Sequence, residues 1–150
     1  MGQTPLMFAC WCGYLDIVQY LVANGADINA QDHKKMSVIS WGVQNGHLAV
    51  IRYLIDKGAD LNAKDKSGET VFMRACYFNQ VAIARLLVEQ DIDIHERYRD
   101  GRIAFWHVCE QGYFELVQLF VEQVSRNRTS PESLHYALIL TVRNGHLIWL

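Results

Sequence analysis

The chain has 150 residues, of which 51% are hydrophobic, and carries a formal net charge of −2 at pH 7, with a pI near 6.3. This charge gives no sequence-independent attraction to nucleic acid or anionic lipid. No apolar run approaches the roughly 20 residues that a membrane-spanning helix needs. Because the first residues, 1–6, enter a repeat directly, we expect no signal peptide there. We therefore expect a monomer in the cytoplasm, or alternatively the nucleus, with no nucleic-acid partner and no membrane insertion.

One motif recurs along the chain with a period of 33 residues. Its most regular copy covers residues 46–65, a close copy covers 13–32, and a weaker copy covers 79–98. Five landmark residues share one position of the repeat: Gly13, Gly46, Asn79, Gly112 and Gly145. A constant period of this length is typical of stacked structural repeats. The pattern favours a binding module, although it does not name the partner.

Three motifs carry a family resemblance: Gly-Gln-Thr-Pro-Leu at 2–6, Gly-His-Leu at 46–48, and Gly-Ala-Asp-Ile/Leu-Asn-Ala-Gln/Lys-Asp at 25–32 and 58–65. They resemble ankyrin repeats, and the resemblance extends over essentially the whole chain. It implies an all-α solenoid in which helix-turn-helix units are joined by extended return loops. We expect one domain, residues 1–150, with about four and a half units. The units are 2–32, 33–65, 66–98, 99–130, and a truncated or degenerate unit at 131–150.

The later units depart from the family pattern in two ways. The Thr-Pro-Leu-His start becomes Ser-Val-Ile-Ser at 37–40, Thr-Val-Phe-Met at 70–73 and Ile-Ala-Phe-Trp at 103–106. The Gly-Ala-Asp turn becomes Asp-Ile-Asp at 91–93 and is absent at Val124. These differences concern local geometry in the later units and leave the predicted fold unchanged.

Each unit is predicted to contain a short helix, a turn at the landmark residue, a longer helix and a loop. In the first unit Pro5 suits the first turn of the short helix, and Gly25 suits the C-cap of the longer one. The second loop, 33–36, has Lys35 where glycine is expected, so we predict a rearranged tip. The inner face of the first long helix is predicted to consist of Leu15, Ile17, Val18, Leu21 and Val22.

The join after the fourth unit breaks the pattern. Residues 124–130 carry no turn signal, whereas Ser130 followed by Pro131 is typical of an N-cap and a first helical position. We therefore predict that the fifth short helix begins near Pro131 and ends at about Asn144. The apolar ending, 147–150, favours a fragment or a solenoid cut before its C-terminal cap.

The cysteines and histidines do not predict chemistry. Cys10, Cys76 and Cys109 share one repeat position, so we expect small buried core residues rather than disulfides or metal ligands. His47 and His146 share the slot after the turn glycine, while His107 and His135 have no partner at zinc-ligand spacing. The sequence contains no nucleophile elbow, phosphate loop or metalloprotease motif. We expect no enzyme activity, no metal and no small-molecule cofactor.

Aromatic residues provide the strongest functional signal. By analogy with the family, the loop tips and the short helices line a concave face where protein or peptide partners dock. Large aromatics at such positions are typical of interface hot spots, and the alternative is that they pack between neighbouring units. We predict Trp11, Trp41, Tyr77 and Phe78 as anchors, with Arg74, Glu69, Lys34, Arg99 and Arg102 setting electrostatic selectivity. Met36 is predicted as a further partner-binding residue.

The function that we predict is a non-catalytic protein–protein interaction module, a scaffold or adaptor. Two alternatives remain open: a regulatory segment of a larger enzyme or channel that makes intramolecular contacts, and a purely structural spacer. The family resemblance also implies possible hydroxylation at Asn29 and Asn62, where a structural role in the loops is a sufficient explanation. Two weaker patterns favour ordinary surface over a function: the glycosylation pattern at 127–129, and the arginines 97, 99, 102, 126 and 128 among acidic neighbours.

Overall fold

The computed structural model describes residues 2–100 and 102–127, and these residues form eight helices. They separate into two compact units, one ending at Ile92 and the other beginning at Asp93, and each unit is described by itself. The predicted single domain over residues 1–150 stays a prediction. The helices are α1 (Pro5–Cys12), α2 (Leu15–Ala23), α3 (Val38–Val43), α4 (Leu48–Asp56), α5 (Val71–Tyr77), α6 (Val81–Val88), α7 (Ala104–Gln111) and α8 (Phe114–Asn127).

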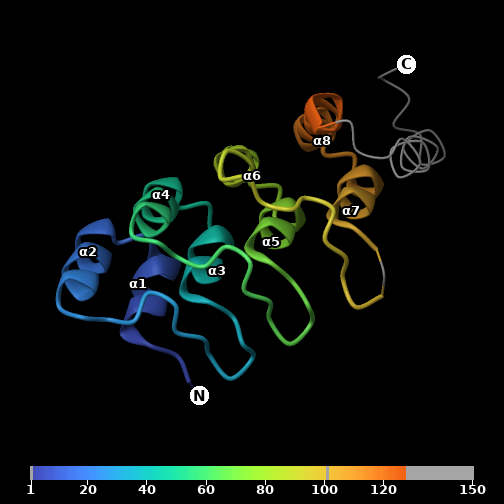
Figure 1. Cartoon of the computed structure of the whole chain (residues 1–150). Helices are drawn as coiled ribbons and strands as arrows, with labels where there is room; N and C mark the ends of the chain where they lie inside the picture. Colours follow the sequence, from blue (N-terminus) through green and yellow to red (C-terminus); the bar gives the residue numbers. More distant parts are fainter. Residues whose placement is uncertain (1, 101, 128–150) are drawn as a thin grey trace. The chain divides into compact units, whose positions relative to one another are not determined.

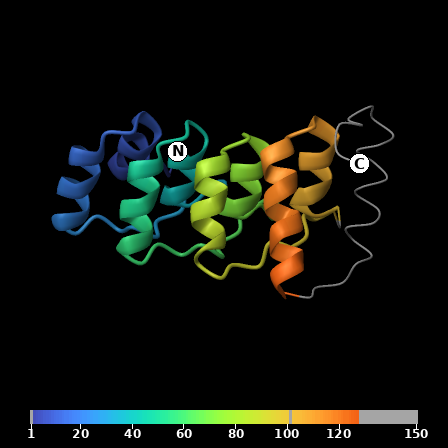
Figure 2. The ribbon, with the colours of Figure 1, turned by 90° about the horizontal axis from the view of Figure 1, so that it is seen from above.

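Within the first unit the helices form two layers (Figure 1). One layer contains the short helices α1, α3 and α5, and the other contains α2, α4 and α6, which lie side by side in Figure 2. Each helix packs on its antiparallel partner and on the same helix of the neighbouring repeat. The loops between successive repeats project beyond the layer of short helices. This arrangement confirms the predicted all-α solenoid with helix-turn-helix units and return loops.

Two of the short helices begin with the same capping arrangement. The Thr4 hydroxyl accepts a hydrogen bond from the backbone N–H of Met7, and the Thr4 N–H donates to the Met7 sulfur in return. Thr70 and Met73 form the same two hydrogen bonds in the third repeat. The reciprocal pair satisfies two backbone groups at the start of the helix. Pro5 stands at the first helical position, as predicted.

Three residues with left-handed backbone replace glycine at turn positions. Asn79 (φ 52°), Asp91 (φ 55°) and Lys35 (φ 61°) each occupy a repeat position that is glycine in another repeat. The prediction of a rearranged tip at Lys35 was wrong, because the loop keeps the same turn as the loop at Gly68 (φ 82°). The N–H of Lys35 donates to the Asp32 carbonyl just as the N–H of Gly68 donates to that of Asp65. The neighbouring hydrogen bonds therefore enforce this backbone even where the residue is not glycine.

The core of the first unit follows the repeat, with an exception at its first helix pair. Val50 and Ile83 occupy the same repeat position and are each 1% exposed, because the preceding helix pair covers them. Ile17, at the same position in the first repeat, is 47% exposed. The prediction that Ile17 belongs to the buried inner face was therefore wrong. Val18 is fully buried, and the other three residues predicted for this face, Leu15, Leu21 and Val22, are half-buried.

The described residues of the second unit, 93–100 and 102–127, form one helix pair and its hairpin loop. An antiparallel bridge joins Arg97 and Ile103, and α7 begins at the following residue. Gly112 (φ 71°) makes the turn between α7 and α8. The rings of Phe105 and Phe120 pack in the core with centroids 4.8 Å apart. The predictions for residues 128–150, which include the helix from Pro131 and the fifth repeat, lie outside the described residues.

The cysteines at the shared repeat position are core residues, as predicted. Cys10, Cys76 and Cys109 are free and fully buried, whereas Cys12 is free and exposed. Burial raises the pKa of the Cys10 and Cys109 thiols to about 12, and it raises the pKa of Cys76 further. Buried thiols with raised pKa values are protonated near neutral pH and react slowly.

We expect a thiol-specific reagent to modify one of the four cysteines quickly in the native chain at about pH 8. The fast thiol should be Cys12, so the Cys12→Ser variant should lose the fast phase entirely. In denaturant all four thiols should react at similar rates, which provides the control. A second fast-reacting thiol in the native chain would contradict the burial described above.

Candidate functional site

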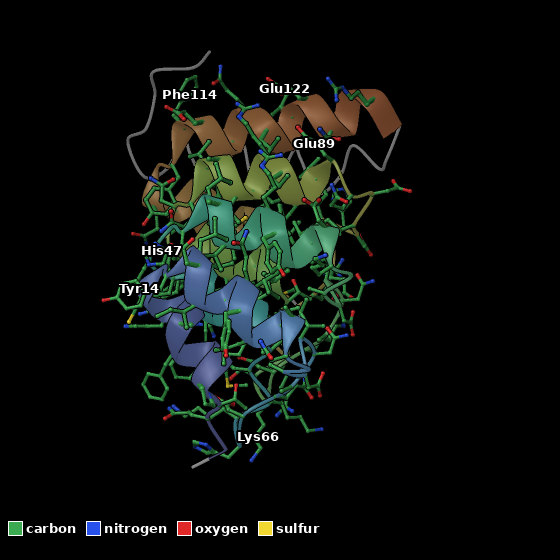
Figure 3. All side chains as sticks on the ribbon, turned by 90° about the vertical axis from the view of Figure 1, so that its left-hand side faces the viewer. Tyr14, His47, Lys66, Glu89, Phe114 and Glu122 are labelled. Atoms are coloured by element: carbon green, nitrogen blue, oxygen red, sulfur yellow. The ribbon has the colours of Figure 1, made fainter. Side chains whose placement is uncertain are left out.

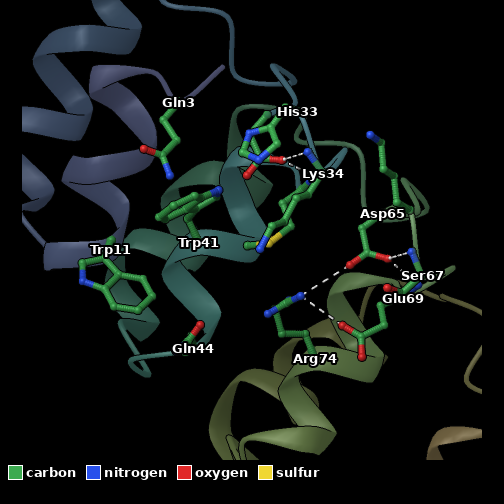
Figure 4. A pocket seen from close by; sticks show the side chains of 13 residues that line it. Gln3, Trp11, His33, Lys34, Trp41, Gln44, Asp65, Ser67, Glu69 and Arg74 are labelled. Carbon is green, nitrogen blue, oxygen red and sulfur yellow. Dashed lines mark hydrogen bonds and ion pairs between the residues drawn. The ribbon is translucent and has the colours of Figure 1, made fainter. Parts of the chain in front are cut away.

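A groove of about 640 Å³ lies in the first unit, between the layer of short helices and the projecting loops (Figure 4). Trp11 of α1 and Trp41 of α3 lie at one end, and Asp65, Glu69 and Arg74 lie at the other. Residues from three successive repeats therefore meet in one surface depression. A cavity of this size is in the range of small-ligand and peptide pockets.

The aromatic end of the groove is built from contacts between neighbouring repeats. The ring centroids of Trp11 and Trp41 are 5.8 Å apart at 69°, and those of Trp41 and Phe8 are 6.0 Å apart at 43°. Both tryptophans are half-buried, whereas Phe8 is exposed. The interpretation that the aromatic residues pack between neighbouring repeats therefore holds for Trp41. Each tryptophan still presents part of its ring to the groove.

The indole nitrogen of Trp41 is the unusual atom at this end. Its N–H is buried and has no hydrogen-bond partner within the described residues. A buried donor without an acceptor costs on the order of 1–3 kcal/mol. The surrounding ring contacts offset that cost and hold the indole in place. The groove wall therefore contains a donor whose hydrogen-bonding capacity is unused.

The charged end of the groove is an ion-pair cluster. The Arg74 guanidinium lies 3.0 Å from a Glu69 carboxylate oxygen and 3.5 Å from an Asp65 carboxylate oxygen. The Arg74 side chain is 13% exposed and also lies 6.0 Å from the Phe78 ring centroid. Partial burial strengthens these interactions relative to a surface pair. Arg74 and Glu69, predicted to provide selectivity, therefore compensate each other's charge.

Two aspartates fix the loops that form the outer wall. One carboxylate oxygen of Asp32 accepts hydrogen bonds from the N–H groups of Lys34 (2.7 Å) and Met36 (3.0 Å). Asp65 repeats this pattern with Ser67 (2.7 Å) and Glu69 (2.9 Å). The N–H of Lys66 donates to the Lys34 carbonyl at 2.9 Å and joins the two loops. The wall is thus pre-formed, because its backbone groups are already paired.

A second set of hydrogen bonds joins the repeats behind the groove. The His47 ring contacts the Trp11 carbonyl at 2.9 Å, and Gln80 donates to the Gln44 carbonyl at 3.1 Å. The Asn45 amide also donates to the Trp11 carbonyl, at 2.8 Å. Figure 3 shows His47 at the same edge as Tyr14, its equivalent in the first repeat, with Lys66 at the end of the loops. His47 is thus more than a turn residue, because it connects two repeats.

The predicted binding residues divide into three groups. Tyr77 and Phe78 do not line the groove; they lie at the end of α5, with ring centroids 5.1 Å apart, and Tyr77 is 52% exposed. Arg99 and Arg102 belong to the second unit, where Arg102 pairs with Asp100 at 3.4 Å. Because the second unit is described by itself, a role for these two arginines beside the groove stays a prediction. The residues that do line it are Trp11, Trp41, Met36, Lys34, Glu69 and Arg74.

Sequence reasoning missed other residues of the groove. Gln3, Gln44 and Lys66 line it but were not among the residues predicted to bind a partner. The repeat period was the signal that could have found them. Gln3 shares its repeat position with Met36, Glu69 and Arg102, and Gln44 shares its position with Trp11 and Tyr77.

The asparagines with predicted hydroxylation lie in the loops and are exposed. The side-chain oxygen of Asn29 accepts a hydrogen bond from the Asp60 N–H at 2.9 Å, which joins the loops of two repeats. The N–H groups of Asn29 and Asn62 donate to Asp27 and Asp60, respectively, both at 2.9 Å. These bonds give both residues a structural role, while their hydroxylation stays a prediction.

Within residues 2–100 and 102–127, no group of three or more histidine, cysteine, aspartate or glutamate side chains could hold a metal ion. The helices of the same residues include none that is long and apolar enough to cross a membrane.

The stacked helix pairs and hairpin loops define a helical-repeat solenoid. A family model described as ankyrin repeat matches residues 1–33, and one described as ankyrin repeats (many copies) matches residues 39–88. The chain belongs to the ankyrin repeat family, as its sequence motifs indicated. Ankyrin repeats are generally protein–protein interaction modules without catalytic activity. No curated protein matches the chain.

Proposed function

We propose that the groove of the first unit is a binding site for a protein or peptide partner and that the chain acts as a non-catalytic scaffold or adaptor. The observation that carries this proposal is the combination of exposed aromatic surface with pre-formed walls in one groove. Half-buried Trp11 and Trp41 line it, and hydrogen bonds to Asp32 and Asp65 hold the loops that enclose it. Pre-formed surfaces lose little conformational entropy on binding.

The row of equivalent positions on the short helices extends the proposed surface. Trp11, Gln44 and Tyr77 share one repeat position on α1, the end of α3 and α5. Aromatic side chains along such a row supply large contact area with few rotatable bonds. We infer that a partner makes its main contacts in the groove and also contacts Tyr77, which lies at the edge of this surface.

The test is affinity capture from cell lysate with the wild-type chain and a Trp11→Ala/Tyr77→Ala variant. The matched control is Tyr14→Ala/Tyr20→Ala, which removes two aromatics that are 58% and 70% exposed away from the groove. We expect partner affinity to fall by about tenfold or more for the first variant and to change little for the control. Circular dichroism should show that both variants remain folded. Equal capture by all three chains would exclude the groove as the site.

A further inference from the structure

The carboxylates of the groove are already engaged. Asp32 is 6% exposed, and one of its oxygens accepts two backbone hydrogen bonds. Asp65 accepts two backbone hydrogen bonds as well, and its second oxygen pairs with Arg74. Glu69 pairs with the same guanidinium. Asp65 and Glu69 therefore share the Arg74 guanidinium, and backbone N–H groups stabilise Asp32, so each carboxylate has partners within the protein.

The lysines of the groove have no such partners. Lys34 and Lys66 line it from the tips of two successive loops, and both are exposed. Lys35 lies beside Lys34 at the same tip and is also exposed. None of the three forms an ion pair within the described residues. The lining contains three carboxylates, Asp32, Asp65 and Glu69, and three cations, Lys34, Lys66 and Arg74. Because the carboxylates and Arg74 already have partners, the charges without partners are the lysines at the rim, and they are positive.

The positive rim faces an aromatic wall. Lys34 lies beside Trp41 (Figure 4), and Met36 of the same loop also lines the groove. The Trp41 indole N–H provides a donor without an acceptor at the same end. A ligand that fits this wall carries a large apolar side chain, and a ligand that fits the rim carries negative charge.

We propose that the groove recognises an acidic peptide segment with a large apolar residue, in which carboxylates pair with Lys34 and Lys66 and the apolar side chain packs on Trp11 and Trp41. This proposal rests on the proposed function and adds the chemistry of the partner. A nucleic acid fits less well, since Arg74 is already paired and two or three lysines neutralise few phosphates.

The test is selection from a library of random peptides displayed on phage. The baits are the wild-type chain, a Lys34→Glu/Lys66→Glu variant, and an Arg52→Glu/Lys57→Glu control with the same net charge change. Arg52 and Lys57 are exposed and do not line the groove. We expect the wild type and the control to select acidic peptides with an aromatic or aliphatic residue. The Lys34→Glu/Lys66→Glu variant should instead select neutral or basic ones.

A synthetic peptide of the selected sequence then gives the affinity. Its Kd should rise by about tenfold for the Lys34→Glu/Lys66→Glu variant and by much less for the control, and salt should weaken wild-type binding. The proposal is overturned if wild-type peptides are not enriched in acidic residues, or if reversal of the lysines leaves the selection unchanged. If the selected peptides lack acidic residues but bind the wild type and not the Trp11→Ala variant, the acidic specificity is wrong and the proposed function still holds.

Two further outcomes would also overturn the acidic specificity. One is a failure of the wild type to enrich any peptide over the unselected library; the lysate capture then decides separately whether the groove binds a folded partner. The other is binding of random-sequence single-stranded RNA with affinity similar to that of the selected peptide, because the free lysines would then serve phosphates.

Discussion

Replacing Ile83 by alanine is expected to lower the free energy of unfolding by about 3 kcal/mol, whereas replacing Ile17 should lower it by less than about 1 kcal/mol. The two residues occupy the same repeat position, and both substitutions remove the same atoms. Ile83 is 1% exposed between α6 and the preceding helix pair, while Ile17 is 47% exposed on α2. The cost differs because a cavity forms only where neighbours surround the deleted atoms.

Urea denaturation followed by circular dichroism measures both values, and Val50→Ala provides a third point at the same position, where the residue is 1% exposed. Because stacked repeats can unfold in more than one step, the comparison requires that the three variants keep the same denaturant dependence. An Ile17→Ala cost equal to that of Ile83→Ala would contradict the exposed position of Ile17. It would indicate that another surface covers α2 in solution, and a dependence of stability on protein concentration would then identify a second copy.

The repeat period predicted the fold because each helix pair contacts only its neighbours. The glycine landmarks located the turns, and the shared position of Cys10 and Cys76 predicted their burial. The same reasoning failed at Ile17, since burial depends on whether a preceding pair is present and not on the residue itself. It also failed at Lys35, where hydrogen bonds around Asp32 impose a left-handed backbone that the residue alone disfavours.

The candidate site was only partly predictable for a related reason. Positions on the short helices and loop tips followed from the repeat, which explains why Trp11, Trp41 and Lys34 lie together in one groove. Interactions between side chains did not follow, because they depend on rotamers and distances. The Arg74–Glu69 pair and the unpartnered Trp41 indole N–H are of this kind. The net accessible charge of the groove could therefore be derived only after the pairs were known.

The second large effect is expected at a turn. Gly13→Ala should lower the free energy of unfolding by about 3 kcal/mol, and Gly25→Ala by about 1 kcal/mol. Both glycines have left-handed backbone, with φ values of 76° and 88°, so alanine is strained at each. A Cβ at Gly25 would meet nothing within 4 Å, whereas a Cβ at Gly13 would lie 2.6 Å from two carbons of the His47 ring. Gly25→Ala is therefore the control for strain alone.

The His47 ring cannot simply move away from the added methyl group, because its contact with the Trp11 carbonyl at 2.9 Å joins the first two repeats. The excess cost of Gly13→Ala should thus depend on His47. In a His47→Ala background we expect Gly13→Ala to cost about 1 kcal/mol, the value for strain alone, as urea denaturation of the four chains of a double-mutant cycle can measure. An unchanged cost in that background would show that the ring is not the obstacle.

Gly46 offers an independent repeat of the experiment, because its added Cβ would lie 2.6 Å from the Gln80 side-chain oxygen, and Gln80 donates to the Gln44 carbonyl. The same coupling there would establish that these turns are glycine because the next repeat reaches over them to hydrogen-bond the one before.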